Sequence, residues 1–524
     1  MYDHKLAGCA QVEVTMERKL KITERYLYIP VCVGKEEKKL EIFLEGEETF
    51  PKKIHELMIP IAESETEEYP CDYFAEIPVE QYWDKDILIS IDASKAFTDR
   101  IKNEDKQEAS KERRPLIHFT ADTGWTNDPN GMIYANGVYH LYFQYNPCNI
   151  KWENMSWGHA VSTDLLHWKQ EDTVLFPDES GTMFSGCAIS NERELLGLPK
   201  DALLFFYTAA GGSNQWSKGL AFTQKIAYSL DGGKTLIKMP DPCLPTIEKE
   251  NRDPKIYWHE ETQAYIMALF LEDNDFAIFR SKDLFHWEQS DRFTLEDAWE
   301  CPDLFHLTSD KGESCWFFWS ADGFYYEGEF DGFHFKTQGK KQNAYVNGIP
   351  YAAQSYFGVT DRVISIPWLR IKNDGRMFTG AYGIPVELAC KKTANGFILI
   401  QRPVRELMQQ AKRIDSGNLT GKGEGRKAYV LEMLAKEDCK GSYLWQINGS
   451  VVEYQPQSGQ FLVDEDNYQI GCGYKEFLFI IDDRILEVFF DGGIQLGTFV
   501  LKEADIQLEI PYEAAAQYTV YEVE

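Results

Sequence analysis

The middle of the chain repeats one short pattern, and this repeat constrains the fold more than any other feature of the sequence. In each unit an apolar, strand-like run is followed by a turn sequence of the form Asp–(Leu/Gly)–x–x–(aromatic or Thr). The runs are GVYHLYFQY, ALLFFYTAA, AYIMALFL, SCWFFWSAD and RVISIPWL, and the turns begin at Asp164, Asp231, Asp283, Asp331 and Asp374. A period of about fifty residues with several strands per repeat is typical of β-propeller blades. Residues 115–400 are therefore predicted to form a five-bladed propeller, the alternative being a multi-sheet β protein without this symmetry.

Further β-rich regions flank the predicted propeller. Residues 1–100 contain short β-rich runs separated by charged or Gly/Pro turns, as in a small β-sandwich. Residues 101–114 are almost wholly charged or polar and predict a linker or a short exposed helix. Residues 405–524 open with a helix-like segment and return to alternating short strands, which predict a C-terminal β-sandwich. The expected fold class is all-β, with an additional N-terminal domain that is β-sandwich-like.

The charge balance restricts the possible partners. Lys and Arg total 54 against 84 Asp and Glu, a formal net charge of −30. A chain this acidic repels nucleic acid and anionic membranes, so we expect neither as a partner. A small neutral carbohydrate carries no such penalty.

The cysteines and the N-terminal sequence predict the compartment. Eleven cysteines without a C-x-x-C pair fit neither a disulfide framework nor a zinc site and suit a reducing compartment. The sequence also has no metal-ligand cluster such as H-E-x-x-H, and we expect neither a metal nor a cofactor. The N-terminal sequence lacks the basic start and apolar stretch of a signal peptide. No apolar run reaches the eighteen or so residues that would span a membrane. We expect a cytoplasmic protein, or a secreted one if a leader has been removed.

Three carboxylates stand in unusual local sequences. Asp128 lies in the turn sequence N-D-P-N-G, which presents it between residues that accept unusual dihedrals. Nearby backbone N–H groups would keep it ionised, as a nucleophile requires. Asp253 lies between Arg252 and Pro254 and would stay charged beside the arginine. Each of these residues, taken alone, could equally be an ordinary turn residue.

Glu300 has a different environment in the sequence, between Trp299 and Cys301 and directly before an apolar strand. Apolar neighbours and a nearby carboxylate favour the protonated form of a glutamate, which a general acid needs. The alternative is a half-buried glutamate paired with a lysine or arginine.

The motifs WTNDPNG, RDP and WECPD, in that order, resemble the signature motifs of glycoside hydrolase family 32, which contains invertases, inulinases and levanases. The resemblance covers residues 115–524. It implies a five-bladed propeller followed by a β-sandwich. Supporting segments are Phe143–Pro147, Trp157–His159, Phe184–Gly186, Tyr351–Ala352 and, in the sandwich, Asp482 with Glu487–Phe489.

The resemblance also implies the roles of individual residues. Asp128 matches the nucleophile, Glu300 the acid/base and Asp253 the stabiliser of the transition state. The implied reaction retains configuration through a covalent fructosyl-enzyme, with the two reacting carboxyls about 5–5.5 Å apart. The residues that match positions lining the subsite for the terminal fructose are Trp125, Asn127, Gln144, Trp152, Phe184, Ser185 and Arg252.

Three departures from the family pattern are visible. Thr126 replaces the commonest Met, with a small expected effect on packing. Residues 345–350 lack the acidic residue that many members carry on the leaving-group side, which leaves the leaving-group preference open. Cys301 is expected to pack beside the acid rather than to act as a second nucleophile.

The motifs leave three functions open. The first is hydrolysis of sucrose or fructo-oligosaccharides. The second is fructosyl transfer to a sugar by the same site, and the third is fructan binding without catalysis. The N-terminal domain could stabilise the propeller, bind carbohydrate, cover the site or mediate assembly.

Overall fold

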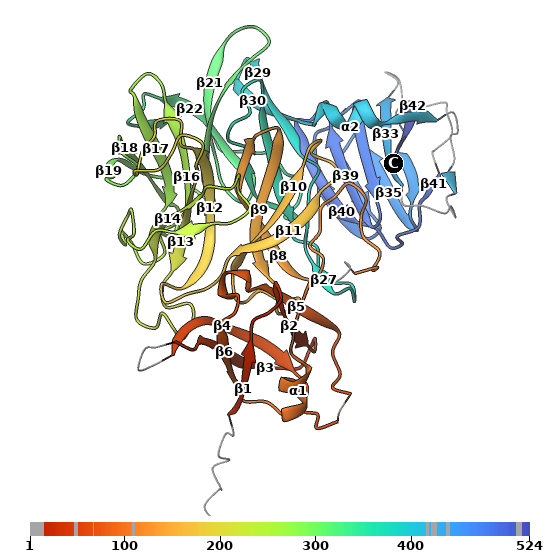
Figure 1. Ribbon diagram of the computed structural model, residues 1–524. Coiled ribbons are helices and arrows are strands. Elements are labelled where there is room, and N and C mark those ends of the chain that lie inside the picture. The colour runs from red at the N-terminus through yellow and green to blue at the C-terminus, as the bar shows by residue number, and fades with distance from the viewer. Residues whose placement is uncertain are drawn as a thin grey trace, which may run out of the picture. The chain divides into compact units, whose positions relative to one another are not determined.

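The computed structural model describes residues 15–46, 51–66, 68–106, 110–414, 419–420, 427–435, 441–509 and 516–524. The first fourteen residues, on which the leader prediction rests, and residues 107–109 of the predicted linker lie outside these ranges. The chain divides into two compact units (Figure 1). The first comprises Met1–Ser110 with Asn146–Asn154, and the second comprises Lys111–Tyr145 with Met155–Glu524.

The first unit is built on two small antiparallel sheets among its described residues. One has the order β1 (Met16–Lys21), β6 (Asp86–Ile91), β3 (Glu36–Leu44), β4 (Lys52–Ile61). The other has the order β5 (Tyr73–Pro78), β2 (Tyr26–Val31), β7 (Lys102–Glu104). Exposed and buried residues alternate along β6, as expected when one face of a strand packs on a core. A 3-10 turn, Glu80–Tyr82, and the helix α1 (Lys95–Arg100) complete the unit.

The segment Asn146–Asn154 folds with this first unit, although it joins two strands of the first propeller blade. Asn154 is buried and exchanges two hydrogen bonds with the backbone of Met58, at 2.7 and 2.8 Å. The side-chain amide of Asn149 donates to Glu37 at 2.6 Å. Because the asparagines pair with backbone and carboxylate oxygens, they satisfy polar groups that would otherwise be buried alone.

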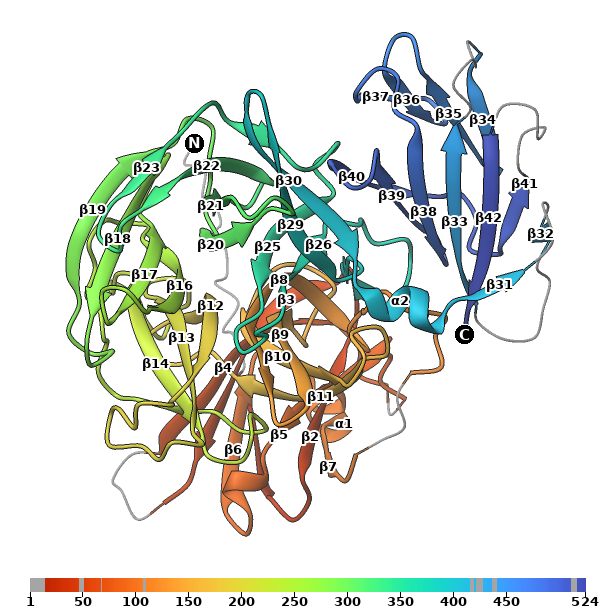
Figure 2. The ribbon, with the colours of Figure 1, turned by 90° about the horizontal axis from the view of Figure 1, so that it is seen from above.

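Residues 111–403 of the second unit form five antiparallel sheets among the described strands, which Figure 2 shows arranged around a common centre. The first is β8 (Gly124–Ala135), β9 (Val138–Asn146), β10 (Ser156–Ser162), β11 (Lys169–Leu175). The second is β12 (Thr182–Ser190), β13 (Leu203–Ala210), β14 (Thr223–Ser229), β15 (Ile237–Lys238). The third is β16 (Arg252–His259), β17 (Ala264–Phe270), β18 (Asp275–Ser281), β19 (Glu288–Thr294). The fourth is β20 (Asp303–Thr308), β21 (Ser314–Trp319), β22 (Phe324–Phe330), β23 (Phe335–Thr337), with β24 (Gln342–Asn343) beside β22.

The fifth sheet is β25 (Pro350–Ser355), β26 (Val363–Leu369), β29 (Val386–Thr393), β30 (Gly396–Pro403), with β28 (Ala381–Tyr382) beside β26. The short strand β27 (Phe378–Thr379) pairs in parallel with β8 and so joins the last blade to the first. The predicted all-β fold with a five-bladed propeller is confirmed. In the described part of the chain no helix is long and apolar enough to cross a membrane.

The repeated aspartates cap one particular turn of the blade. Asp164, Asp231, Asp283 and Asp331 each follow the third strand and accept hydrogen bonds from two backbone N–H groups two to four residues ahead. This is how a short polar side chain fixes a turn between strands. Asp374, the fifth match, has another role, because it follows the second strand of its blade and pairs with Arg376 and Arg484.

The C-terminal part of the second unit is a β-sandwich, preceded by the helix α2 (Arg405–Gln410) where the sequence predicts one. One described sheet has the order β31 (Lys412–Ile414), β42 (Ala516–Val523), β33 (Ala428–Ala435), β38 (Glu476–Asp482), β39 (Ile485–Phe490), β40 (Gln495–Val500). The other has the order β32 (Leu419–Thr420), β41 (Gln507–Glu509), β34 (Tyr443–Ile447), β35 (Ser450–Gln455), β36 (Gln460–Val463), β37 (Asp466–Gln469). Aromatic residues such as Trp445, Tyr454 and Phe479 fill the space between them.

A buried polar cluster joins the sandwich to the propeller. His118, just before the first blade, contacts Asp482 at 2.9 Å and Glu487 at 3.2 Å, and all three side chains are almost fully buried. Burial alone lowers the pKa of His118, but the hydrogen bonds and charges of the two carboxylates raise it to about 9. Asp482 also accepts the backbone N–H groups of Leu116 and Ile117. The buried imidazole is therefore charged at neutral pH and compensates the carboxylates.

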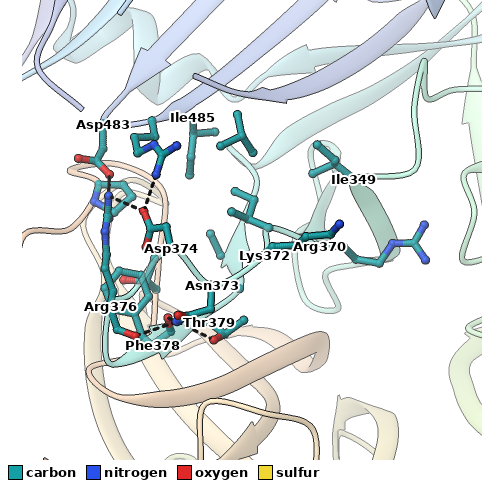
Figure 3. Close-up of a pocket in the computed structure, with 17 residues that line it drawn as sticks. Ile349, Arg370, Lys372, Asn373, Asp374, Arg376, Phe378, Thr379, Asp483 and Ile485 are labelled. Carbon is teal, nitrogen blue, oxygen red and sulfur yellow. Dashed lines mark hydrogen bonds and ion pairs between the residues drawn. The ribbon is translucent and has the colours of Figure 1, made fainter. Parts of the chain in front are cut away.

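A second polar contact lies beside a cavity of about 400 Å³ at the same junction (Figure 3). Arg376 pairs with Asp483 at 2.6 Å and with Asp374 at 3.3 Å, and Arg484 pairs with Asp374 at 3.0 Å. These ion pairs connect the segment after β26 to the turn between β38 and β39. Asp374 therefore pairs with arginines at this junction and does not cap a turn after the third strand of a blade.

The His118 cluster predicts how stability depends on pH. The pKa of His118 is raised from 6.5 to about 9 in the folded state, so its stabilisation is complete below about pH 6.5 and is lost as pH rises through 9. His118→Gln should cost about 3–5 kcal/mol at pH 7, because it leaves buried carboxylates uncompensated. Thermal unfolding from pH 6 to 10 measures both effects. His286→Gln, at an exposed imidazole, is the control, and equal curves for His118→Gln and wild type would refute the assignment.

Candidate active site

The residues singled out in the sequence gather at the first strands of five different blades. Asp128 lies on β8, Ser185 on β12 and Asp253 on β16. Glu300 precedes β20, and Tyr351 lies on β25. Because the first strands surround the centre of the propeller, residues distant in sequence meet there (Figure 2).

Irregular backbone aims these side chains. The pairing register shifts at Met183/Gly186 in β12, at Arg252/Lys255 in β16 and at Tyr351/Gln354 in β25. Bulges of this kind turn a side chain away from the regular alternation of a strand. Asp253 has φ of 64°, and Glu300 has φ of 29°. Such values are costly for residues with a Cβ and are concentrated at functional sites.

Asp128 is surrounded by donors from side chains. Ser185 donates to its Oδ2 at 2.7 Å, and Asn127 also hydrogen-bonds to it. Burial and then the charge of Glu300 raise the pKa of Asp128 to about 6, although these donors lower it. The expectation that backbone N–H groups keep Asp128 ionised is wrong, because the donors are side chains. These donors lower the pKa but only partly offset the effect of burial and Glu300. At neutral pH the carboxylate is still mostly ionised.

Asp253 is almost fully buried, and its oxygen Oδ2 accepts the backbone N–H of Cys301 at 3.1 Å. Arg252 approaches the same oxygen at 3.7 Å and lowers the pKa. Burial and the charges of Glu300 and Asp128 outweigh the arginine and raise the pKa to about 7. The prediction that Arg252 keeps Asp253 fully charged is therefore wrong, because Arg252 directs its hydrogen bonds to Glu300.

Both carboxylate oxygens of Glu300 accept hydrogen bonds. Arg252 donates to Oε2 from Nη2 at 2.8 Å and from Nε at 3.1 Å, and the hydroxyl of Tyr351 donates to Oε1 at 2.5 Å. The prediction that Trp299 and Cys301 give Glu300 apolar surroundings is therefore wrong. The alternative prediction, a glutamate paired with an arginine, describes the contacts. Donors at both oxygens leave the carboxyl little freedom to rotate.

Cys301 has a role that the sequence does not reveal. Its buried thiol donates to Oδ2 of Asp128 at 3.6 Å and to Oδ2 of Asp253 at 3.5 Å. Burial and the surrounding carboxylates raise the pKa of Cys301, so the thiol stays protonated and remains a donor. A neutral thiol is not a nucleophile, which agrees with the expectation from the sequence. The side chain does more than pack, because it links two of the three acids.

The side of the site at residues 345–350 receives a carboxylate from another blade. Asp322 lies in the β21–β22 turn, and its pKa is raised by burial and by Glu300 and lowered by Arg370. Arg370 in turn lies over the ring of Tyr351, 4.1 Å from its centroid. An acidic residue near Glu300 is thus supplied by the fourth blade, which sequence position alone did not indicate.

The predicted subsite residues fall into two groups. Six of the seven lie in the second unit, and one lies in the first. Trp125 donates to Asn127 at 2.9 Å, the amide of buried Gln144 donates to the Met183 carbonyl, and Phe184 packs against Phe222. Ser185 and Arg252 contact the carboxylates directly. Trp152 lies in the Asn146–Asn154 segment of the first unit, with 49% of its surface exposed. The catalytic and subsite roles stay predictions.

A pair of Asp or Glu side chains at one centre is the equipment that most glycoside hydrolases use. A sequence model described as "Glycosyl hydrolases family 32 N-terminal domain" matches residues 118–403. That match spans more than half of the chain, so the chain belongs to glycosyl hydrolase family 32.

Curated relatives match the same part of the chain. A levanase of Bacillus subtilis (strain 168) is 35% identical in an alignment of 327 residues that covers 56% of this chain and 47% of the levanase. An extracellular exo-inulinase of Aspergillus niger is 33% identical in an alignment of 345 residues that covers 55% of this chain and 64% of that protein. The chain thus spans about half to two thirds of the length of these relatives.

Solved structures share the fold. The crystal structure of exo-inulinase from Aspergillus awamori superposes with a TM-score of 0.69 at 24% identity and covers 80% of this chain and 99% of that one. A fructofuranosidase of Schwanniomyces occidentalis superposes equally well, with a TM-score of 0.69 at 23% identity.

Because the carboxylates are crowded, we expect the site to lower the free energy of unfolding. Asp128→Asn and Asp253→Asn should each raise the free energy of unfolding at pH 8 by about 1–3 kcal/mol, because burial disfavours the charged forms. The folded-state pKa of each acid is raised from 3.8, so the penalty is absent below about pH 4, grows as pH rises above 4, and is complete above about pH 6 for Asp128 and about pH 7 for Asp253. Denaturant unfolding at both pH values tests this. Asp201→Asn, at an exposed carboxylate, is the control, and destabilisation by both site variants at pH 8 would contradict the analysis.

Proposed function

We propose that the protein hydrolyses terminal β-D-fructofuranosyl bonds of sucrose or fructo-oligosaccharides with retention of configuration. The observation that carries the proposal is the linked set of acids. Glu300 is held by Arg252 and Tyr351, while the Cys301 thiol joins Asp128 to Asp253. The names of the curated relatives, levanase and exo-inulinase, favour a fructan-type substrate.

The first chemical step requires an acid and a nucleophile. Glu300 gives its proton to the departing glycosidic oxygen, and Asp128 attacks the anomeric carbon of fructose to form a fructosyl-enzyme. Arg252 and Tyr351 hold the Glu300 carboxyl from which this proton leaves. With a pKa of about 6, Asp128 is ionised and nucleophilic at neutral pH.

The second step releases the sugar. Glu300, now a base, activates a water molecule, which attacks the same carbon and frees fructose with retained configuration. Asp253 accepts hydrogen bonds from fructose hydroxyls and stabilises the positive charge that develops on the ring. The Cys301 thiol holds both aspartates in register through the two steps.

The proposal includes a small neutral substrate and a cytoplasmic location. A net charge of −30 favours neutral sugars over polyanions. Buried free thiols such as Cys148, Cys187 and Cys243 accord with a reducing compartment. A cytoplasmic enzyme would meet short, imported sugars rather than polymers.

Product analysis tests the reaction. Wild type should release fructose from sucrose and from inulin- or levan-type oligosaccharides, and Asp128→Asn should lower kcat by a factor of about 10³ or more, since no covalent step remains. Glu300→Gln should lose most activity on sugar leaving groups but retain turnover of an aryl fructoside, whose leaving group needs no acid. Chromatography identifies the products, and the anomeric configuration of the fructose first released shows whether configuration is retained.

The controls separate the alternatives. Asp201→Asn should behave like wild type. Longer or cyclic products with little free fructose would assign the site to fructosyl transfer. No turnover of any fructoside by folded wild type would refute the proposal.

The acid side of the pH profile should report the aspartates. The wild-type value of kcat/KM should fall as pH falls through about 6, because protonated Asp128 cannot attack; the apparent pKa belongs to the coupled cluster. Cys301→Ala removes a donor that lowers the pKa of Asp128, so the acid limb should move to higher pH. Cys301→Ser keeps a donor and should stay closer to wild type. An unmoved limb in Cys301→Ala would contradict the role of the thiol.

A further inference from the structure

The three consecutive residues Trp299, Glu300 and Cys301 make three different sets of contacts. The Cys301 thiol contacts Asp128 and Asp253, so it marks the side on which the fructosyl ring must lie. The Trp299 ring contacts Phe270 instead, with the centroids 5.6 Å apart. Glu300, between them in sequence, accepts hydrogen bonds from Arg252 and Tyr351.

Arg252 connects the tryptophan to the acid. Its guanidinium lies 4.5 Å from the centroid of Phe270 and donates to Glu300 at 2.8 Å. Trp299, Phe270, Arg252 and Glu300 therefore form one continuous set of contacts. The contacts of the Trp299 ring thus lead through Phe270 and Arg252 to Glu300, whereas the Cys301 thiol contacts the two aspartates.

The backbone around Trp299 is fixed while its ring is open. Asn274 donates to the carbonyl of Ala298 at 2.7 Å, and the N–H of Ala321 donates to the carbonyl of Trp299 at 3.0 Å. The side chain nevertheless exposes 39% of its surface. Among the described tryptophans only Trp83 and Trp152 are also strongly exposed, and both belong to the first unit. A large and exposed apolar ring is thus carried by a hydrogen-bonded backbone segment directly before Glu300 in the sequence.

We propose that Trp299 is the platform for the leaving-group sugar, the unit on the far side of the scissile bond from the terminal fructose. This inference rests on the proposed function. The acid must stand beside the departing oxygen, so the leaving sugar lies on the side of Glu300 away from Asp128. An aromatic face stacks on the C–H groups of a pyranose or furanose ring and recovers the cost of its exposure. The same face would hold a sugar acceptor, because transfer reverses the first step with another alcohol in place.

Leaving groups of different size provide the test. Trp299→Ala should lower kcat/KM about tenfold for sucrose and for an inulin-type trisaccharide, which have a ring to stack. For methyl β-D-fructofuranoside, which has none, it should change kcat/KM less than about twofold. Trp299→Phe should recover most of the loss. Inhibition by free glucose and the yield of transfer products at high sugar concentration should also fall in Trp299→Ala.

The outcomes are distinguishable. Trp83→Ala, at an exposed tryptophan of the first unit, should behave like wild type on all three substrates. Equal losses on the methyl fructoside and the oligosaccharides would mean that Trp299 only supports Glu300, and equal rates for wild type and Trp299→Ala would also overturn the platform. If wild type turns over none of the three, the proposed function itself fails, and the inference fails with it.

Discussion

Repulsion among three crowded carboxylates, of which Asp253 is almost fully buried, is the constraint on which the rest of the site depends. Asp128, Asp253 and Glu300 can be held together only if donors and a cation offset their mutual charge. Arg252 supplies the cation, and Ser185, Tyr351 and Cys301 supply the donors. Even so, the two aspartates have raised pKa values. The protein thus stores free energy in the arrangement that chemistry at the site requires.

The propeller makes this arrangement possible because each blade contributes a residue to the site. Every first strand ends near the same axis, so no single loop must carry several acids. Bulges and positive φ angles at Asp253, Glu300 and Ala352 then turn individual residues toward the centre. This local backbone strain is tolerated because regular antiparallel sheets surround the strained residues.

A second buried charge cluster holds the propeller and sandwich as one unit. His118 compensates Asp482 and Glu487, which lie more than 360 positions further along the chain. The ion pairs of Arg376 with Asp374 and Asp483 add a more exposed contact at the same junction. Charges that are costly to bury are thus placed where they fix how two β domains pack, because only one arrangement satisfies all partners.

The sequence by itself determined the fold class, the family and the ordered acid motifs, because strand periodicity and turn chemistry are local properties. It also located the repeated turns, although Asp374 matched the pattern without sharing the role. Only the tertiary structure decided the environment of each acid. The grip of Tyr351 on Glu300, the carboxylate of Asp322 and the thiol bridge of Cys301 join residues from different strands and blades. Protonation depends on such neighbours and on burial, and neither can be read from the order of residues along a chain.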